Sequence, residues 1–200
     1  MKEARKLIAK AKDEKNKSLI LVNIGLKKVE DFDTTELQSF TMISLASNSI
    51  KLLTKQFSAL DSLSVISLSD NSFDHIPPAL FGLQNMIFLN LSSNKINSIT
   101  CQLNKCPSLR LLDLSNNNID SKSNLKDIFE IKSLTALYLS DNSIAHIPPE
   151  LKNLTKLEVL SIRNNQINNL PQEVSNLVKL NELYIQHNKL QFLPPELGEL

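Results

Sequence analysis

The chain has 200 residues, a formal net charge of +1, 42% hydrophobic residues and 22% charged residues. This length suits one domain with a substantial core, and the small net charge excludes a global field that would draw the protein onto nucleic acid or an anionic membrane. No stretch approaches the ~18 consecutive apolar residues of a membrane span. Residues 1–17 lack the apolar segment of a secretory signal, and two cysteines are too few for a disulfide framework. The sequence therefore predicts a soluble protein of the reducing cytoplasm.

Residues 1–17 are rich in lysine, and their apolar residues recur at helical spacing. Ala4, Leu7, Ile8 and Ala11 would share one side of a helix. A basic amphipathic helix can also lie on a membrane surface, but this apolar stripe is narrow and half of it is alanine. We therefore predict that residues 1–17 form an N-terminal cap helix, which covers the region that follows.

From residue 18 onward one pattern, L-x-x-L-x-L-x-x-N-x-L, recurs at nearly constant spacing. The first copy keeps Leu19, Leu21 and Leu26 but lacks the asparagine. Seven later copies carry it, 23 residues apart except for one interval of 25, at Asn48, Asn71, Asn94, Asn117, Asn142, Asn165 and Asn188. A repeat of this length and pattern is typical of a leucine-rich-repeat solenoid.

The pattern predicts an α/β fold of about eight repeats over residues 18–200. In L-x-L the leucines alternate, so they point to one side of a short strand while the residues between them point to the other. Strands of successive repeats would stack in parallel into a curved sheet, with the leucines inside a right-handed horseshoe and the intervening residues on its concave face. The asparagines would form a ladder that satisfies backbone groups buried by the turn after each strand.

The return segments carry apolar pairs that would fill the convex layer, and several begin with proline, which ends the strand and starts a short helical turn. The pairs are Leu80/Leu83, Leu103/Cys106, Ile128/Ile131, Leu151/Leu154, Val174/Leu177 and Leu197/Leu200. End repeats of a solenoid need caps. Because the sequence stops at the last of these pairs, we expect the C-terminal cap to be missing from it.

Motifs for chemistry are weak. Cys101 and Cys106 form a C-x4-C pair without a second cysteine pair, and Cys106 stands at a leucine-type position. His75, His146 and His187 are scattered over three repeats. No phosphate-binding glycine loop or hydrolase motif is present. The sequence predicts a protein without catalytic, cofactor or metal-binding residues, which therefore acts by binding another protein.

Function is expected on the concave face, where the strand columns differ along the chain. Serine and alanine dominate the N-terminal repeats, whereas large and charged residues appear from Asn90 onward. Tyrosine and arginine are enriched at binding hot spots. The predicted protein-binding residues are Asn90, Arg110, Asp113, Tyr138, Asp141, Arg163, Tyr184 and His187, with Phe88 beside them.

Several segments resemble the Ras-suppressor family of intracellular leucine-rich-repeat proteins. The resemblance is most specific over residues 109–200, in Leu134-Thr-Ala-Leu-Tyr-Leu-Ser-Asp-Asn142 and in Leu183-Tyr-Ile-Gln-His-Asn188 followed by Leu193-Pro-Pro-Glu-Leu-Gly198. The longer repeat after Asn116 looks like that family's one extended repeat.

This resemblance implies a cytoplasmic adaptor at integrin adhesions. Such proteins bind the last LIM zinc finger of the adaptor PINCH, join its complex with integrin-linked kinase and parvin, and damp Ras signalling. Their concave face makes the contact, and Asn90, Asp113, Asp141 and Arg163 stand in the matching columns.

Two alternatives stay open. The chain could be a scaffold that recruits a phosphatase or a Ras-type GTPase, or it could be the recognition module of a larger enzyme. The LIM finger and the GTPase can be distinguished by direct binding, and an appended catalytic domain would show in the full reading frame.

Overall fold

A computed structural model describes residues 2–29, 34–99 and 102–199 of the chain. Eight three-residue strands form one sheet, in which every strand pairs in parallel with the next one along the chain. They are β1 (Ser18–Ile20), β2 (Met42–Ser44), β3 (Val65–Ser67), β4 (Phe88–Asn90), β5 (Leu111–Asp113), β6 (Ala136–Tyr138), β7 (Val159–Ser161) and β8 (Glu182–Tyr184). The predicted solenoid of eight stacked repeats is confirmed.

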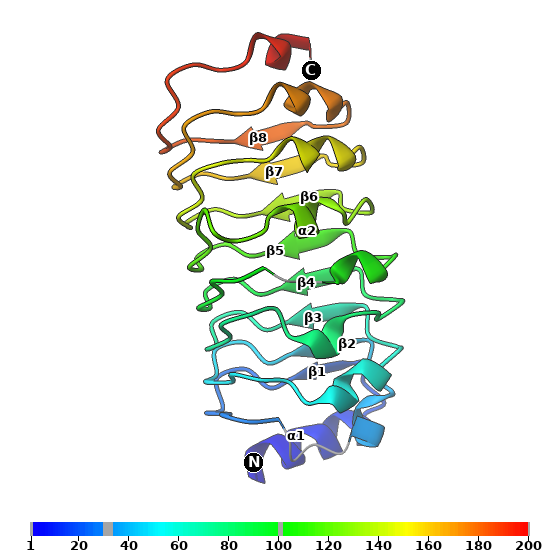
Figure 1. Ribbon diagram of the computed structural model, residues 1–200. Helices are drawn as coiled ribbons and strands as arrows, with labels where there is room; N and C mark the ends of the chain where they lie inside the picture. The colour runs from blue at the N-terminus through cyan, green and yellow to red at the C-terminus, as the bar shows by residue number, and fades with distance from the viewer. Residues whose placement is uncertain (1, 30–33, 100–101, 200) are drawn as a thin grey trace.

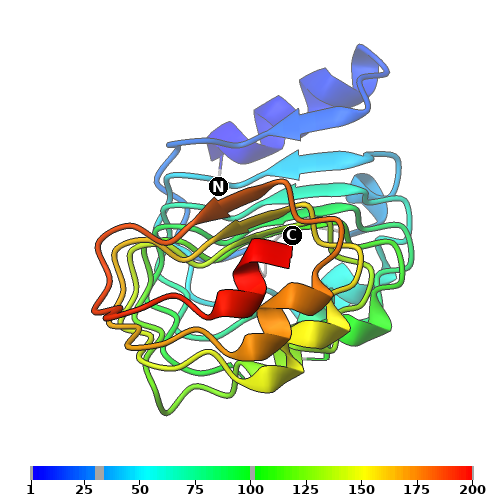
Figure 2. The same ribbon diagram turned by 90° about the horizontal axis from the view of Figure 1, so that it is seen from above.

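Each repeat is one coil, with its strand on one wall and a short helical turn on the opposite wall (Figures 1 and 2). Most of these turns are 3-10 helices: η1 (Thr34–Leu37), η2 (Lys55–Ala59), η3 (Pro78–Leu80), η4 (Leu103–Lys105), η5 (Pro149–Asn153), η6 (Gln172–Asn176) and η7 (Pro195–Glu199). Prolines stand at or just before the start of η3, η5, η6 and η7, as the sequence predicts.

The core fills the space between the two walls as one continuous cluster. Strand leucines such as Leu89, Leu112 and Leu137 are fully buried, and they meet the apolar pairs of the return segments. Those pairs are buried from Leu80/Leu83 to Val174/Leu177. Leu197 is half-buried, and Leu200 lies outside the described residues. Each repeat thus buries its apolar side against its neighbours.

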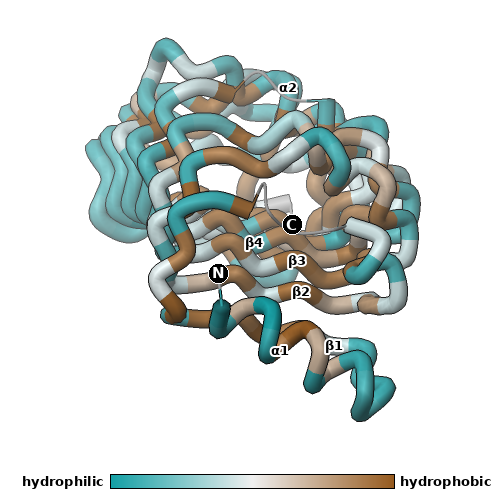
Figure 3. Tube along the Cα trace, turned by 90° about the horizontal axis from the view of Figure 1, so that it is seen from below, coloured by the Kyte–Doolittle hydropathy of each residue, from teal (hydrophilic) through white to brown (hydrophobic). Residues whose placement is uncertain are grey.

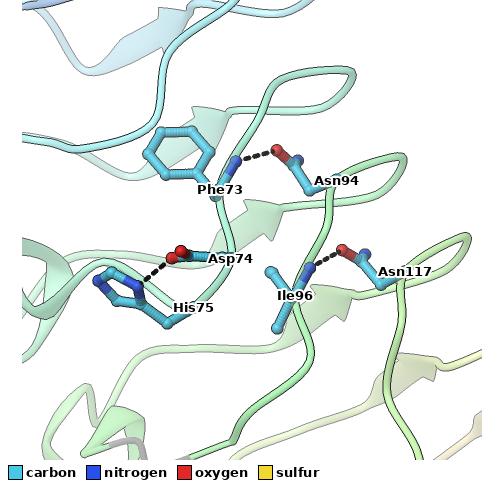
Figure 4. Close-up of polar contacts among 6 residues, drawn as sticks. All are labelled: Phe73, Asp74, His75, Asn94, Ile96 and Asn117. Atoms are coloured by element: carbon cyan, nitrogen blue, oxygen red, sulfur yellow. Dashed lines mark hydrogen bonds and ion pairs between the residues drawn. The ribbon is translucent and has the colours of Figure 1, made fainter.

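The asparagine ladder connects each turn to the repeat before it (Figure 4). The side-chain oxygen of Asn94 accepts a hydrogen bond from the backbone N–H of Phe73, at 3.0 Å. Its Nδ2 donates to the carbonyl of Leu68 in the preceding repeat and to the carbonyl of Leu91 in its own, both at 3.0 Å. The same arrangement recurs at each of the seven asparagines. Each side chain therefore satisfies backbone groups that the turn removes from water.

The residue before each ladder position has a left-handed backbone, with φ between 52° and 57°. These residues are Asn23, Ser47, Asp70, Ser93, Asn116, Asp141, Asn164 and His187. In all but the last, the N–H donates to a carbonyl of the next repeat, as Asp141 does to Arg163 at 3.0 Å. The left-handed turn thus extends the interstrand hydrogen bonds beyond the short strand, and Asn, Asp and His tolerate this conformation better than most residues.

Helix α1 (Lys2–Asp13) packs against β1 at the N-terminal end of the stack, on the strand side of the first coil (Figure 3). Ala4, Ile8 and Ala11 are buried and Leu7 is partly buried, whereas the lysines face outward. The apolar side is the one that the sequence predicts, but the helix ends at Asp13 and not at the predicted residue 17, because Lys15 has a left-handed backbone with φ of 53°. The residue of the first repeat that aligns with the ladder is Ile24, which packs partly buried where later repeats have asparagine.

The interval of 25 residues between Asn117 and Asn142 holds a short α-helix, α2 (Lys126–Phe129), in place of a 3-10 turn. Nζ of Lys126 lies 2.6 Å from Oε1 of Glu150 in the following repeat. The other oxygen, Oε2, is buried and has no hydrogen-bond partner among the described residues. The hydrogen bond from Lys126 lowers the pKa of the Glu150 carboxyl.

Cys106 is buried within the core, where its sulfur donates to the Leu80 carbonyl at 3.4 Å. Burial raises the pKa of this thiol, so it is a packing residue, as its leucine-type position predicts. Cys101, its partner in the C-x4-C pair, lies outside the described residues.

Among the helices that the structure describes, none has the length and apolar character needed to cross a bilayer.

Replacing Asn142 by Ala should lower the free energy of unfolding by about 1–3 kcal/mol, because it leaves the buried N–H of Ile119 and three carbonyls without their partner. Urea titration followed by circular dichroism measures the change. Asn118→Ala, at an exposed neighbour of the ladder, is the control and should stay within about 0.5 kcal/mol of the wild type. Equal losses in both variants would contradict the structural role of the ladder.

Replacing Lys126 by Met should destabilise the protein near neutral pH but not in acid. The pKa of Glu150 is lowered in the folded state below its ordinary value of 4.5, so the ion pair stabilises the protein above that pH and its contribution is lost as pH falls through the folded-state pKa. Unfolding measured from pH 7 to pH 3 should show the two proteins converging below pH 4.5. A constant difference at all pH values would mean that Lys126 acts through packing alone.

Candidate protein-binding face

Strand register places the concave face in straight columns. The concave face consists of the side chains that alternate with the buried leucines and point away from the core. One column contains the last residue of every strand: Ile20, Ser44, Ser67, Asn90, Asp113, Tyr138, Ser161 and Tyr184. The predicted parallel stacking of successive strands is confirmed along this whole column. Neighbouring strands lie about 4.8 Å apart, so side chains on three successive strands can contact one ligand.

Four of the eight predicted binding residues line one hollow of about 390 Å³ over strands β6, β7 and β8. They are Tyr138, Asp141, Arg163 and Tyr184. Ser115, Ser140 and Ser161 complete the lining together with Glu182, which was not among the predicted residues. The structure therefore gathers the large side chains of the C-terminal repeats into one site.

The hollow is partly organised by its own hydrogen bonds. The Tyr184 hydroxyl donates to Oε2 of Glu182 at 2.7 Å, and this bond to the carboxylate raises the pKa of the tyrosine. Nδ2 of Asn164 donates to Oδ1 of Asp141, also at 2.7 Å. Both carboxylates are thus held in place while remaining on an exposed surface, where a partner can reach them.

The other four predicted residues lie outside the hollow. Oδ1 of Asp113 accepts from the N–H of Ser115 at 2.9 Å, and Oδ1 of Asn90 accepts from the N–H of Ser92 at 2.8 Å. Both side chains remain on the concave face, one and two strands before Tyr138.

Arg110 precedes β5, and its guanidinium donates to the Ser133 carbonyl at 2.9 Å. It therefore joins two adjacent repeats at the strand entrance. His187 is exposed in the turn after β8. Neither residue lines the hollow.

Backbone conformation gives a second reason for two of the predicted residues. Asp141 and His187 have φ of 56° and 57°. They belong to the residues with left-handed backbone that precede the ladder positions, which we call the left-handed column. Polar residues at this column are favoured by the fold in every repeat. Tyr138 and Arg163 have no such backbone requirement, because serine occupies their columns in other repeats. These two residues and Tyr184 therefore carry the argument for binding.

Glu182 was missed at the level of sequence, and only Phe88 was named there from an apolar column of the concave face. The first residue of each strand also points to the concave face, and in six successive strands it is apolar: Met42, Val65, Phe88, Leu111, Ala136 and Val159. All but Ala136 are partly exposed. The alternation of inward and outward residues could have found both features if it had been extended two residues before the column of last strand residues.

The histidines are not brought together. Nδ1 of His75 contacts Oδ1 of its neighbour Asp74 at 2.5 Å (Figure 4), while His146 and His187 lie in other repeats. Within the described residues, no group of three or more His, Cys, Asp or Glu side chains is arranged to hold a metal ion.

Family comparisons agree with this architecture. A model of the leucine-rich repeat region matches residues 89–200, and a single leucine-rich repeat model matches residues 62–83. The chain belongs to the leucine-rich-repeat family, whose domains generally serve as protein-interaction modules. Among proteins of curated function, none matches the sequence significantly.

Solved structures show the same fold. A leucine-rich-repeat protein of Leptospira interrogans is 29% identical, with a TM-score of 0.69 over 88% of this chain. The plant peptide hormone receptor RGFR1 in complex with RGF2 is 30% identical over 78% (TM-score 0.65), and PEPR1–AtPEP1 is 31% identical over 81% (TM-score 0.68). The chain spans 50%, 26% and 24% of these three structures respectively.

The left-handed column predicts how Asp141 tolerates substitution. Asp141→Asn should leave stability nearly unchanged, whereas Asp141→Val should cost about 1–2 kcal/mol, because a β-branched residue is strained at φ of 56°. Paired urea titrations measure the difference. If the valine variant is as stable as the asparagine variant, the polar residues of this column are not there for backbone reasons.

Proposed function

We propose that the protein is a non-enzymatic binding module whose concave face, over strands β4 to β8, docks a segment of a partner protein. The observation that carries this proposal is the hollow formed by Tyr138, Arg163, Glu182 and Tyr184 on three adjacent strands. Large aromatic and arginine side chains on an exposed surface are characteristic of binding hot spots. The fold does not need them, because serine fills the same columns elsewhere.

The apolar column would add contact area beside the hollow. Within this face the column runs along four strands, from Phe88 to Val159, about 14 Å at the usual strand spacing. A partner segment lying across the strands could bury apolar side chains against this column and place polar ones in the hollow. Protein interfaces commonly combine an apolar region with polar surroundings in this way.

For the partner itself we propose a LIM-type zinc finger of a PINCH-like adaptor. This choice rests on the resemblance to the Ras-suppressor family, and it brings integrin-linked kinase, parvin, a cytoplasmic location at adhesions and an effect on Ras signalling as further expectations. Charge gives it physical support, since Asp113, Asp141 and Glu182 offer carboxylates to the lysines and arginines of a finger.

Two other candidates remain. A phosphatase or Ras-type GTPase could occupy the same face, because the residues in its columns do not specify the fold of the partner. The chain could also be the recognition module of a larger enzyme, and its short span of the matched structures is compatible with this.

The test is binding of a purified LIM finger, with a GTP-loaded Ras-type GTPase in parallel, measured by isothermal titration calorimetry. The double variant Asp113→Lys/Asp141→Asn should lose at least about tenfold in affinity, because it removes two carboxylates and adds a like charge. The asparagine is chosen since it tolerates the left-handed backbone.

A control variant places lysine and asparagine in the same two columns of one earlier repeat, two repeats before Asp113 and three before Asp141. Ser67→Lys/Asp70→Asn introduces lysine and asparagine on the serine-rich half of the face and should bind like the wild type. Finger binding that survives the Asp113/Asp141 variant would place the interface elsewhere. Binding of the GTPase alone would change the class of partner.

A further inference from the structure

Two tyrosines flank a serine in the hollow of the concave face. Strand register aligns Tyr138 of β6, Ser161 of β7 and Tyr184 of β8 in one column. These strands are neighbours in the stack (Figure 1), so the tyrosines stand two strand spacings apart, about 9.5 Å. The small side chain between them leaves a slot. A planar group stacked between both rings needs about 3.5 Å on each side, or about 7 Å in all. Rotation of either ring can reduce the separation of about 9.5 Å to this value.

The floor of the slot is polar and buried. Ser140 and Ser161 are only 4% and 5% exposed, and their hydroxyls share one hydrogen bond of 2.7 Å. Two hydroxyls carry two hydrogens and four lone pairs. One mutual bond therefore leaves capacity to donate to, and to accept from, a group that enters the slot.

The rim of the slot is negative. Glu182 and Asp141 line it, against the single positive charge of Arg163. Oε2 of Glu182 accepts the hydrogen bond of the Tyr184 hydroxyl. The other oxygen, Oε1, accepts no hydrogen bond from any residue that the structure describes. One uncompensated negative charge beside two aromatic faces is an environment that attracts a cation.

We propose that this slot binds the guanidinium group of an arginine side chain presented by the partner; the inference rests on the proposed function of the concave face. Arginine fits better than lysine for three reasons. Its guanidinium is flat and stacks between aromatic rings, its several N–H groups can reach both the floor hydroxyls and the Glu182 carboxylate, and it is desolvated more readily than an ammonium.

A small probe tests the slot without knowledge of the partner. N-acetyl-arginine amide is titrated into the 15N-labelled 200-residue chain, and amide shifts are followed by NMR. The shifts should saturate and be largest at Ser140, Ser161 and Tyr184. N-acetyl-citrulline amide, which is nearly the same shape but neutral, should bind about tenfold more weakly. N-acetyl-lysine amide should fall between the two.

Variants locate the probe. Tyr184→Leu and Glu182→Gln should each weaken arginine binding about fivefold or more, since one removes an aromatic face and the other a charge. Asp70→Asn, an exposed change in the N-terminal half, is the control and should leave it unaltered. The proposal is overturned by equal binding of arginine and citrulline, by full binding in Tyr184→Leu, or by the absence of saturable shifts at the slot.

The outcomes separate the slot from the proposed function. If a LIM finger binds the concave face but the arginine probe does not shift the slot residues, the face stands and the slot proposal is wrong. If the probe binds and neither protein partner does, the slot stands and the partner assignment is wrong.

Discussion

The structure depends on satisfying the backbone where each strand turns into the coil. A three-residue strand provides few interstrand hydrogen bonds, and the turn that follows would leave N–H and C=O groups buried and unpaired, at a cost of about 1–3 kcal/mol each. Asparagine solves this problem because its amide donates and accepts at once. Asn117, for example, accepts from the N–H of Ile96 at 2.9 Å and donates to the carbonyls of Leu91 and Leu114 at 3.1 and 3.0 Å. The ladder connects every repeat to the one before it.

This constraint divides each repeat into positions that the fold determines and positions that it leaves free. Leucine and asparagine positions are set by burial, and the position before the asparagine is set by its left-handed backbone. The outward positions of the strand carry neither requirement. Ser44, Ser67 and Ser161 show that a serine is enough there. Tyr138 and Tyr184 in the same column are therefore residues that the fold permits but does not explain, which is why they indicate function.

The same division explains what the sequence could predict. The strand positions, the asparagine ladder and the buried side of α1 follow from the spacing of residues, several short turns follow from prolines, and each is present. The left-handed column was harder to predict, since its residues are chemically mixed and only their φ angles unite them. Glu182 was missed because it is the first residue of its strand, two residues before Tyr184, and six other strands have an apolar residue at that position. The paired hydroxyls of Ser140 and Ser161 could not be predicted, because serines are common and only the register shows which two meet.

A repeat fold also limits how a site can arise. No repeat contributes more than a few outward side chains, so a pocket requires neighbouring repeats to depart from the common pattern together. Here Tyr138, Arg163 and Glu182 come from three successive repeats, and they converge only because the parallel register keeps equivalent positions adjacent. A change of repeat length within this stretch would separate them. The extra two residues of the long repeat instead lie in the return segment that contains α2, before Tyr138 and away from the strands. The register of β5, β6 and β7 is thereby unbroken, and the concave face stays continuous across the longest repeat.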